Sequence, residues 1–331
     1  MKNSKTLVAI ILPGLLTLTL FACNPSRGDG EGGSIVRLSI ATGGTGGVFY
    51  PLGGGIAKII GESIPNVEAT AEVTAASVDN LKFLRDRKAD LAFTTADTLA
   101  EGVNGTGAFK DTKVPLRTLA GLYKNYTHVV TLASSPIKSM KDLKGKVVST
   151  GSPGSGAEVT AFRILQEYGI DPQKDITRQG LGATESADAL KDGKVDAFFW
   201  SGGIPTAAVL DLAHTSGITI RMVSNDGVLE ALQTKYGKGL YVQGIVPKAT
   251  YRGLDGDVGV VSIPNLLVVH ADMDENLVYE ITKALFTRRE QLVAIHPEAA
   301  NVSLESAVKD SPAPFHPGAI RYYKEQNVWP E

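Results

Sequence analysis

The sequence contains a single cysteine and two tryptophans, and neither sign of charge is in marked excess. Among 331 residues it has 33 Lys and Arg against 35 Asp and Glu, so the net charge is −2 and no basic surface for nucleic acid is indicated. One cysteine cannot form a disulfide within the chain. The five histidines are scattered, and no pair has the spacing of metal ligands. We therefore expect no metal, no cofactor and no nucleic-acid partner.

The sequence also has no uninterrupted hydrophobic run of membrane-spanning length. Two lysines precede an apolar stretch, 7–20, that a Pro-Gly pair interrupts, and this pattern is typical of a signal peptide covering residues 1–22. Cys23 stands where a lipoprotein signal peptidase would leave it as the new N-terminus, which predicts a lipid anchor on an exported protein. The alternative is a plain secretory signal with an incidental cysteine. Residues 23–34 are polar and glycine-rich, and we expect a flexible tether.

Beyond the tether, short apolar runs alternate with segments of helical periodicity. The first strand is expected at 35–40, and Pro51 is expected to open the first helix because proline is favoured in a first helical turn. Alternation of strands and helices indicates parallel sheets with crossover helices. The sequence therefore predicts an α/β fold, with further strands at 67–73, 91–94, 129–132, 146–149 and 195–199 and further helices at 78–88, 158–168, 185–191 and 276–287.

One pattern occurs in both halves of the chain. A helix end, a tight turn and an aspartate lead into an apolar strand at 84–93 and again at 190–199. Two similar α/β lobes are what a protein that closes around a ligand requires. Ligands of open α/β sheets bind beyond the carboxyl ends of the strands. The pattern therefore points to the residues after these strands, 94–97 and 200–203.

A glycine-rich segment, 42–51, lies between the first strand and the first helix. Its glycines permit close approach of a ligand, and the helix N-terminus behind them favours an anion. Thr45, Gly46, Gly47 and Tyr50 are the candidate contacts. A nucleotide fingerprint does not fit, because Phe49 stands where the third glycine belongs and no Lys-Ser/Thr pair follows. A carboxylate therefore fits this segment better than a pyrophosphate.

A second Gly/Ser-rich segment, 149–158, follows a strand and precedes a helix. Ser155 and Glu158 have the spacing of a capping box, which explains both residues structurally. Ser152 and Gly154 are freer to meet a ligand, and the segment makes a second anion site at a helix N-terminus. Ser155 stays a candidate contact beside its capping role.

Two further candidates complete the predicted site, and no catalytic set accompanies them. Ser77 opens the helix at 78–88 and is expected to cap it first and to contact a ligand second. Trp200 follows the strand at 195–199 and either lines the cleft or packs in the core; we favour lining. The serine loops do not fit a Gly-x-Ser-x-Gly nucleophile elbow, because Thr150 and Pro153 occupy the glycine places. We therefore expect no enzyme, and an anchored serine hydrolase is the weaker alternative.

Several of these segments resemble the TAXI family, the solute-binding proteins of tripartite ATP-independent periplasmic (TRAP) transporters. The segment Gly44-Thr45-Gly46-Gly47-Val48-Phe49-Tyr50-Pro51 is similar to the family's signature. The other matching segments are 77–81, 89–93, 122–130, 142–148, 151–156, 196–207 and 264–269.

The resemblance implies a two-lobed periplasmic binding-protein fold, type II-like, with the ligand cleft between the lobes. It also implies transport driven by an ion gradient, delivery to integral-membrane TRAP permease subunits, and a small carboxylate ligand such as glutamate or a dicarboxylate. The family's ligand region corresponds to Thr45, Gly46, Gly47, Tyr50, Ser77, Ser152, Gly154, Ser155 and Trp200.

We expect the chain to cross between the lobes twice, near 123–129 and near 263–269. Lobe I then comprises 35–125 and 266–331, and lobe II comprises 126–265. The expected location is periplasmic or otherwise extracytoplasmic. A ligand-sensing lipoprotein that reports to a membrane receptor is the alternative to transport, and the sequence does not separate the two.

Overall fold

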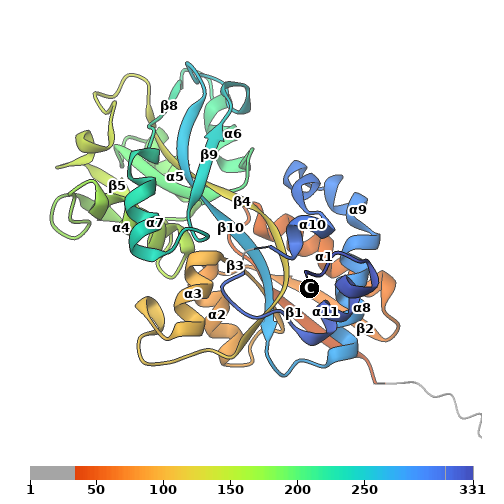
Figure 1. Cartoon of the computed structure of the whole chain (residues 1–331). Coiled ribbons are helices and arrows are strands. Elements are labelled where there is room, and N and C mark those ends of the chain that lie inside the picture. The colour runs from red at the N-terminus through yellow and green to blue at the C-terminus, as the bar shows by residue number, and fades with distance from the viewer. Residues whose placement is uncertain (1–33, 310, 331) are drawn as a thin grey trace, which may run out of the picture. The chain divides into compact units, whose positions relative to one another are not determined.

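The computed structural model describes residues 34–309 and 311–330 (Figure 1). The predicted signal peptide, nearly all of the tether and Cys23 lie outside the described residues, so those predictions stay untested. Residues 35–331 form one compact unit, and everything below concerns it.

The described strands form one sheet of ten strands in the order β2-β1-β3-β10-β4-β7-β5-β6, with β8 paired to β4 and β9 paired to β10. The predicted α/β class is confirmed. The strands are β1 (Val36–Ala41), β2 (Val67–Glu72), β3 (Leu91–Thr95), β4 (Leu116–Leu132), β5 (Val147–Ser149), β6 (Thr177–Gln179), β7 (Ala197–Gly202), β8 (Ile220–Met222), β9 (Val242–Val246) and β10 (Val258–His270).

Helices gather in two groups, which β4 and β10 join (Figure 1). One group contains α1 (Phe49–Ser63), α2 (Ser77–Arg85), α3 (Ala96–Asn104), α8 (Glu275–Thr287), α9 (Arg289–Val293), α10 (Leu304–Ala307) and α11 (Pro317–Glu325). The other contains α4 (Gly156–Glu167), α5 (Ala183–Lys191), α6 (Ala207–His214) and α7 (Leu229–Tyr236). The 3-10 turns are Gly107–Phe109, Met140–Leu143, Asp226–Val228, Lys248–Thr250 and Pro297–Asn301.

The two halves of the sheet share one arrangement. In the first half-sheet, parallel strands β2, β1 and β3 end beside the antiparallel strand β10. In the second half-sheet, parallel strands β6, β5 and β7 end beside the antiparallel strand β4. β3 and β7 are therefore equivalent strands, and they are the strands that follow the two copies of the repeated sequence pattern.

Equivalent hydrogen bonds confirm this repeat. The Asp90 carboxylate accepts from the Ser39 N–H of β1 at 2.8 Å, and the Asp196 carboxylate accepts from the Val147 N–H of β5 at 2.8 Å. The turn before each aspartate contains a left-handed residue, Arg87 at φ 57° in the first copy and Gly193 at φ 71° in the second. Each aspartate thus ties the start of its own strand to the central strand of its half-sheet.

Strands β4 and β10 run through both halves and pair with one another along much of their length. Their register shifts between Pro264 and Leu266 and again between Leu267 and Val268. Proline has no N–H, so Pro264 cannot donate a hydrogen bond to either neighbouring strand. The crossing ribbon is therefore irregular where it passes from one half-sheet to the other.

The hydrophobic core has three clusters. One packs α1, α8 and α11 on the first half-sheet, one packs α5 and α6 on the second, and the third is continuous across β4 and β10. Val278, Ile281 and Leu285 of α8 are buried, as their helical spacing predicts. Helix α1 begins at Phe49, two residues before the predicted start, because its N-cap residue Val48 makes no side-chain capping bond that the sequence would reveal.

Candidate functional site

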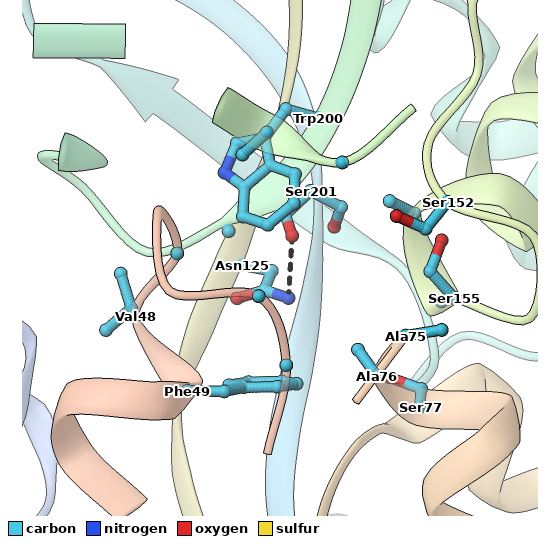
Figure 2. Close-up of a pocket in the computed structure, with 18 of the residues that line it drawn as sticks. Val48, Phe49, Ala75, Ala76, Ser77, Asn125, Ser152, Ser155, Trp200 and Ser201 are labelled. Carbon is cyan, nitrogen blue, oxygen red and sulfur yellow. Dashed lines mark hydrogen bonds between the residues drawn. The ribbon is translucent and has the colours of Figure 1, made fainter. Parts of the chain in front are cut away.

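A cavity of about 50 Å³ lies between the two helix groups, at the carboxyl ends of strands from both half-sheets (Figure 2). A single water needs roughly 10–15 Å³, so the cavity suits a compact solute. Its walls are Gly43, Gly44, Gly47, Val48, Phe49, Ala75, Ala76, Ser77, Tyr123, Asn125, Ser152, Ser155, Gly156, Ala157, Gly182, Ala183, Trp200, Ser201 and Gly202.

Four helices begin at the cavity wall. Val48 and Phe49 start α1, Ala76 and Ser77 start α2, Ser155 and Gly156 start α4, and Gly182 and Ala183 start α5. The first N–H groups of a helix have no partner within the helix, and the helix dipole adds a partial positive charge there. The wall contains no Asp, Glu, Lys, Arg or His. The cavity is therefore electropositive without holding a formal charge.

The glycine-rich segment contacts the opposite side of the cavity. Gly47 donates its N–H to the carbonyl of Gly44 at 3.1 Å, which closes a tight turn. A side chain at Gly47 would meet the Trp200 ring at 2.9 Å, and one at Gly46 would meet Thr184 and Ala208. Both glycines are needed because the backbone approaches the second helix group this closely.

The serine-containing segment makes the reciprocal contact. Gly151 and Gly154 have φ of 98° and 85°, a region that favours glycine. The Gly154 carbonyl accepts from the backbone N–H groups of Val78 and Asp79, both at 3.1 Å. These two N–H groups at the start of α2 are therefore hydrogen-bonded to the loop on the other side of the cavity and are not available to a solute.

Ser77 has a different local role from the predicted one. It is the first residue of α2, whereas the N-cap is Ala76, which has φ 91° and makes no side-chain cap. The Ser77 hydroxyl oxygen instead accepts from the Thr95 N–H of β3 at 3.2 Å. The capping prediction is thus wrong, because an unusual backbone at Ala76 moves the helix start by one residue; the Ser77 side chain still lines the cavity. By contrast, the Ser155 hydroxyl caps α4 by accepting from the Glu158 N–H at 3.1 Å, as predicted.

Two buried hydroxyl groups at the wall have no hydrogen-bond partner among the described residues: Tyr123 Oη and Ser201 Oγ. These residues are 3% and 7% exposed, so water does not satisfy them from bulk solvent. Their neighbour Asn125 does have partners, since one amide N–H donates to the Ser201 carbonyl at 3.3 Å and the amide oxygen accepts from Asn265 at 2.7 Å. Buried polar groups nearly always have partners, so the two hydroxyls indicate where a bound solute makes hydrogen bonds.

Trp200 forms one wall of the cavity, as favoured from the sequence (Figure 2). Its indole N–H donates to Thr206 Oγ1 at 3.0 Å, so the ring orientation is fixed from the side away from the cavity. The loop after Trp200 is also held by the C-terminal segment: the Ile204 N–H donates to Glu298 at 2.8 Å, and His296 contacts the Pro205 carbonyl at 3.0 Å. Burial raises the pKa of Glu298.

The structure brings five of the nine predicted contacts to the cavity wall: Gly47, Ser77, Ser152, Ser155 and Trp200. The other four are not in the wall. Thr45 is exposed and Tyr50 is half-buried beyond the helix start, whereas Gly46 and Gly154 form the contacts across the cavity described above.

Sequence reasoning missed Tyr123, Asn125 and the Gly182-Ala183 helix start, whereas Ser201 lies in the segment 200–203 to which the repeated pattern pointed. The sequence does mark the Gly182-Ala183 helix start, because Gly180-Leu181-Gly182 lies between a strand and a helix, as the glycine-rich and serine-containing segments do. Tyr123 and Asn125 lie within the long strand β4, where no local pattern marks a ligand contact.

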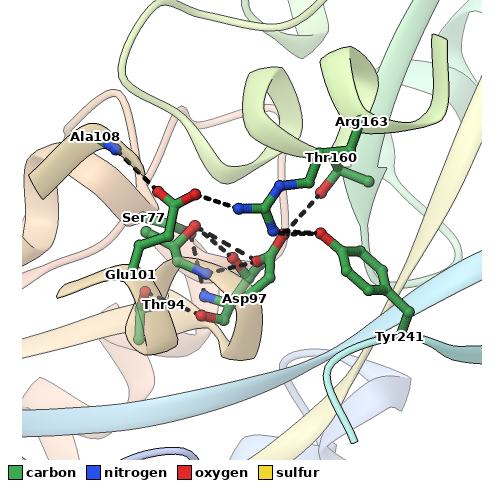
Figure 3. A network of polar contacts seen from close by, with 10 residues as sticks. Ser77, Thr94, Asp97, Glu101, Ala108, Thr160, Arg163 and Tyr241 are labelled. Atoms are coloured by element: carbon green, nitrogen blue, oxygen red, sulfur yellow. Dashed lines mark hydrogen bonds and ion pairs between the residues drawn. The ribbon is translucent and has the colours of Figure 1, made fainter. Parts of the chain in front are cut away.

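A buried polar network joins the helix groups beside the cavity (Figure 3). Arg163 of α4 donates to Glu101 of α3, to Tyr241 at 2.6 Å and to Asp97 at 3.5 Å. Tyr241 in turn donates to Asp97 at 2.8 Å. Burial opposes the charge of Arg163, but the neighbouring carboxylates outweigh it and raise the arginine's pKa, while burial raises the pKa of Glu101.

Within residues 34–309 and 311–330, no helix is both long enough and apolar enough to cross a bilayer. The same part of the chain has no group of three or more His, Cys, Asp or Glu side chains arranged to hold a metal ion.

Comparison with known proteins gives a family match and distant structural matches. The model of the NMT1-like family matches residues 40–326. A protein from Bordetella bronchiseptica RB50 is 18% identical with a TM-score of 0.52, covering 89% of this chain and 90% of that one, which shows a shared fold.

Two further structural matches have lower scores. A putative L-cystine ABC transporter protein from Listeria monocytogenes is 18% identical over 81% of this chain and 98% of that one, with a TM-score of 0.49. The periplasmic aliphatic sulphonate binding protein SsuA from Escherichia coli is 16% identical over 88% of this chain and 84% of that one, with a TM-score of 0.43.

Proposed function

The chain belongs to the NMT1-like family, and we propose that it is an exported solute-binding protein that captures a compact anionic solute. The observation that carries the proposal is the cavity enclosed by four helix starts without any charged side chain. Helix N-termini stabilise anions through their unpaired N–H groups and dipole. Small carboxylates are the proposed solutes, and the TAXI-like segments support this class.

Closure of two lobes is the proposed mechanism of capture. Lobe I comprises residues 35–125 and 266–331, and lobe II comprises residues 126–265. The two helix groups support this division, because α1 to α3 and α8 to α11 fall in lobe I and α4 to α7 fall in lobe II. A solute that contacts both walls shifts the population toward the closed form.

Binding without catalysis is part of the same proposal. Ser152 and Ser155 are the hydroxyls that a hydrolase would use, but no histidine or carboxylate lines the cavity to take a proton from either. The Ser155 oxygen is also occupied in capping α4. These observations support a site that binds its ligand and releases it unchanged.

Delivery to a membrane transporter completes the proposal. The TAXI-like segments favour TRAP permease subunits as the partner, and the signal sequence with Cys23 supports an extracytoplasmic location with a lipid anchor. A co-purification of the protein with its candidate permease in membranes, dependent on solute, would support the partner.

A thermal-shift panel tests the binding proposal. A ligand that binds only the folded state adds about 2.7 kcal/mol of stability at a hundredfold excess over its Kd. We expect at least one short carboxylate to raise the melting temperature and neutral analogues of the same size to leave it unchanged. The opposite pattern, a shift with neutral solutes alone, would overturn the anion assignment.

A further inference from the structure

We propose that the cavity selects carboxylates that carry no ammonium group, and so binds short oxo, hydroxy or dicarboxylic acids in preference to α-amino acids. This inference rests on the proposed function and names the solute class of the same site. It follows from which polar groups the wall contains and which it omits.

The wall is well supplied with donors for a carboxylate. The starts of α1, α4 and α5 lie in the wall, where the first N–H groups of a helix have no partner within the helix. The hydroxyls of Tyr123 and Ser201 have no partner among the described residues. A carboxylate has about four acceptor positions and no proton to place. Its binding would therefore satisfy buried donors that the protein itself leaves unpaired.

An ammonium group finds no anionic partner in this wall. Hydroxyl and carbonyl oxygens can accept from it but carry no charge to offset its burial, and burying an unpaired charge is costly. The four helix starts add a repulsive term, because their partial charge is positive. The carboxylate of an α-amino acid therefore contributes favourably to the free energy of binding, whereas its ammonium group contributes unfavourably.

Three acidic side chains lie near the cavity: Glu158, Asp79 and Glu185, whose carboxylate lies beside the wall residue Gly182. Glu158 accepts from Arg178 at 3.0 Å and from the Gly154 N–H at 3.1 Å. Asp79 pairs with Lys82 at 3.5 Å, and its half-buried carboxylate lies beside Gly154. None of these side chains is part of the wall, so an ammonium group in the cavity meets no carboxylate directly.

The rest of the wall suits a short carbon skeleton. Val48, Phe49, Ala76, Ala157 and Trp200 present apolar surface between the polar groups. An oxo or hydroxy substituent adds a small polar atom that the Ser and Tyr hydroxyls accommodate, whereas an ammonium group adds a full charge. The wall thus discriminates between solutes by the charge of this substituent and not by the length of the carbon skeleton.

Titration calorimetry with matched pairs tests this inference. The pairs are glutarate with glutamate, succinate with aspartate, and 2-oxoglutarate with glutamate, so each differs chiefly at the amine. We expect at least one amine-free member to bind at least tenfold more tightly than its partner. Equal or tighter binding of the amino acid in every pair would overturn the inference while leaving carboxylate binding intact. Failure of every acid, with the protein folded, would instead count against the proposed function and the inference together.

A charge placed in the wall gives an independent test. Ser152→Asp adds a carboxylate to the half-buried wall position beside the α5 start, and Ser152→Asn adds a neutral group of the same shape. Relative to the Asn variant, the Asp variant should weaken the best amine-free acid at least fivefold and should narrow its preference over the matched amino acid. An unchanged preference in Ser152→Asp would contradict the charge argument.

Discussion

Arg163 of α4 and Asp97 of α3 lie with guanidinium and carboxylate 3.5 Å apart, in a buried contact that joins the two helix groups. Glu101 pairs with the same guanidinium, so one cation serves two carboxylates. Removal of one partner from a buried ionic group leaves uncompensated charge, which costs far more than the loss of a surface pair.

Arg163→Met should therefore lower the free energy of unfolding by about 3–5 kcal/mol, because Asp97 and Glu101 remain buried without their cation. Urea unfolding measures the change. Lys235→Met is the matched control: its amine pairs with Glu167 at 2.7 Å but is largely exposed, so the loss should stay within about 1 kcal/mol. Equal losses in the two variants would show that the buried network does not stabilise the structure.

Gly46→Ala should weaken solute binding at least tenfold and leave the ligand-free melting temperature close to that of the parent protein. The added methyl group meets Thr184 and Ala208 in the structure, and in the proposed closure an open form would separate these residues and accommodate it. Calorimetry with the carboxylate that gives the largest thermal shift measures the effect. Gly54→Ala is the control: a methyl group added there, on an open face of α1, would have no neighbouring atom within 4 Å, so this variant should bind the solute normally. Normal binding by Gly46→Ala would mean that the bound form lacks this contact.

Tryptophan fluorescence should report solute binding through Trp200 alone. The chain has two tryptophans: Trp200 is in the cavity wall, whereas Trp329 packs against Phe315 and Tyr323 near the C-terminus. A Trp329→Phe variant should keep the ligand-induced change in emission, and a Trp200→Phe variant should lose it. A signal that follows Trp329 instead would place the solute away from this cavity.

His128 should make stability fall as the pH is lowered from about 6.5 to about 4. Burial lowers the pKa of this histidine from 6.5 to about 4. Its Nδ1–H donates to the Tyr126 carbonyl at 2.7 Å, so Nε2 is the acceptor that faces the Tyr251 hydroxyl at 2.9 Å. Above pH 6.5 the histidine is neutral in both the folded and the unfolded protein, and its contribution to stability is fully present. Between pH 6.5 and about 4 only the unfolded chain binds a proton at this histidine, so that contribution is lost.

The expected loss from His128 is about 3 kcal/mol between pH 7 and pH 4, from about 1.4 kcal/mol per pKa unit. The measurement compares urea unfolding of the parent protein with His128→Gln at both pH values. Burial raises the pKa of Glu101, but the contributions of the carboxyl groups cancel in the difference between the two proteins. A difference that does not change with pH would contradict the assignment.

Much of the fold was predictable because its signals are local. The turn before Asp90 and the turn before Asp196 repeat in the sequence, and they precede equivalent strands with equivalent hydrogen bonds. Strand β4 was recovered only over 129–132, since much of its length is buried on both faces and lacks an alternating pattern.

The site was only partly predictable for the same reason. The glycine-rich and serine-containing loops carry local signals, and both contribute to the cavity wall. Tyr123 and the Arg163 network depend on residues brought together from distant parts of the chain, such as Asp97 and Tyr241. No spacing within one segment records those contacts.

The irregular pairing of β4 and β10 has a consequence for tuning affinity. In the proposed closure, the free energy gained from the solute must also twist this two-stranded ribbon, and Pro264 removes one of the hydrogen bonds that would stiffen it. A substitution at Pro264 that restores a donor would make the ribbon harder to deform and would raise Kd from a position that never touches the solute. Selection can thus adjust how tightly the protein holds its cargo, and how readily it lets go, without altering which cargo it recognises.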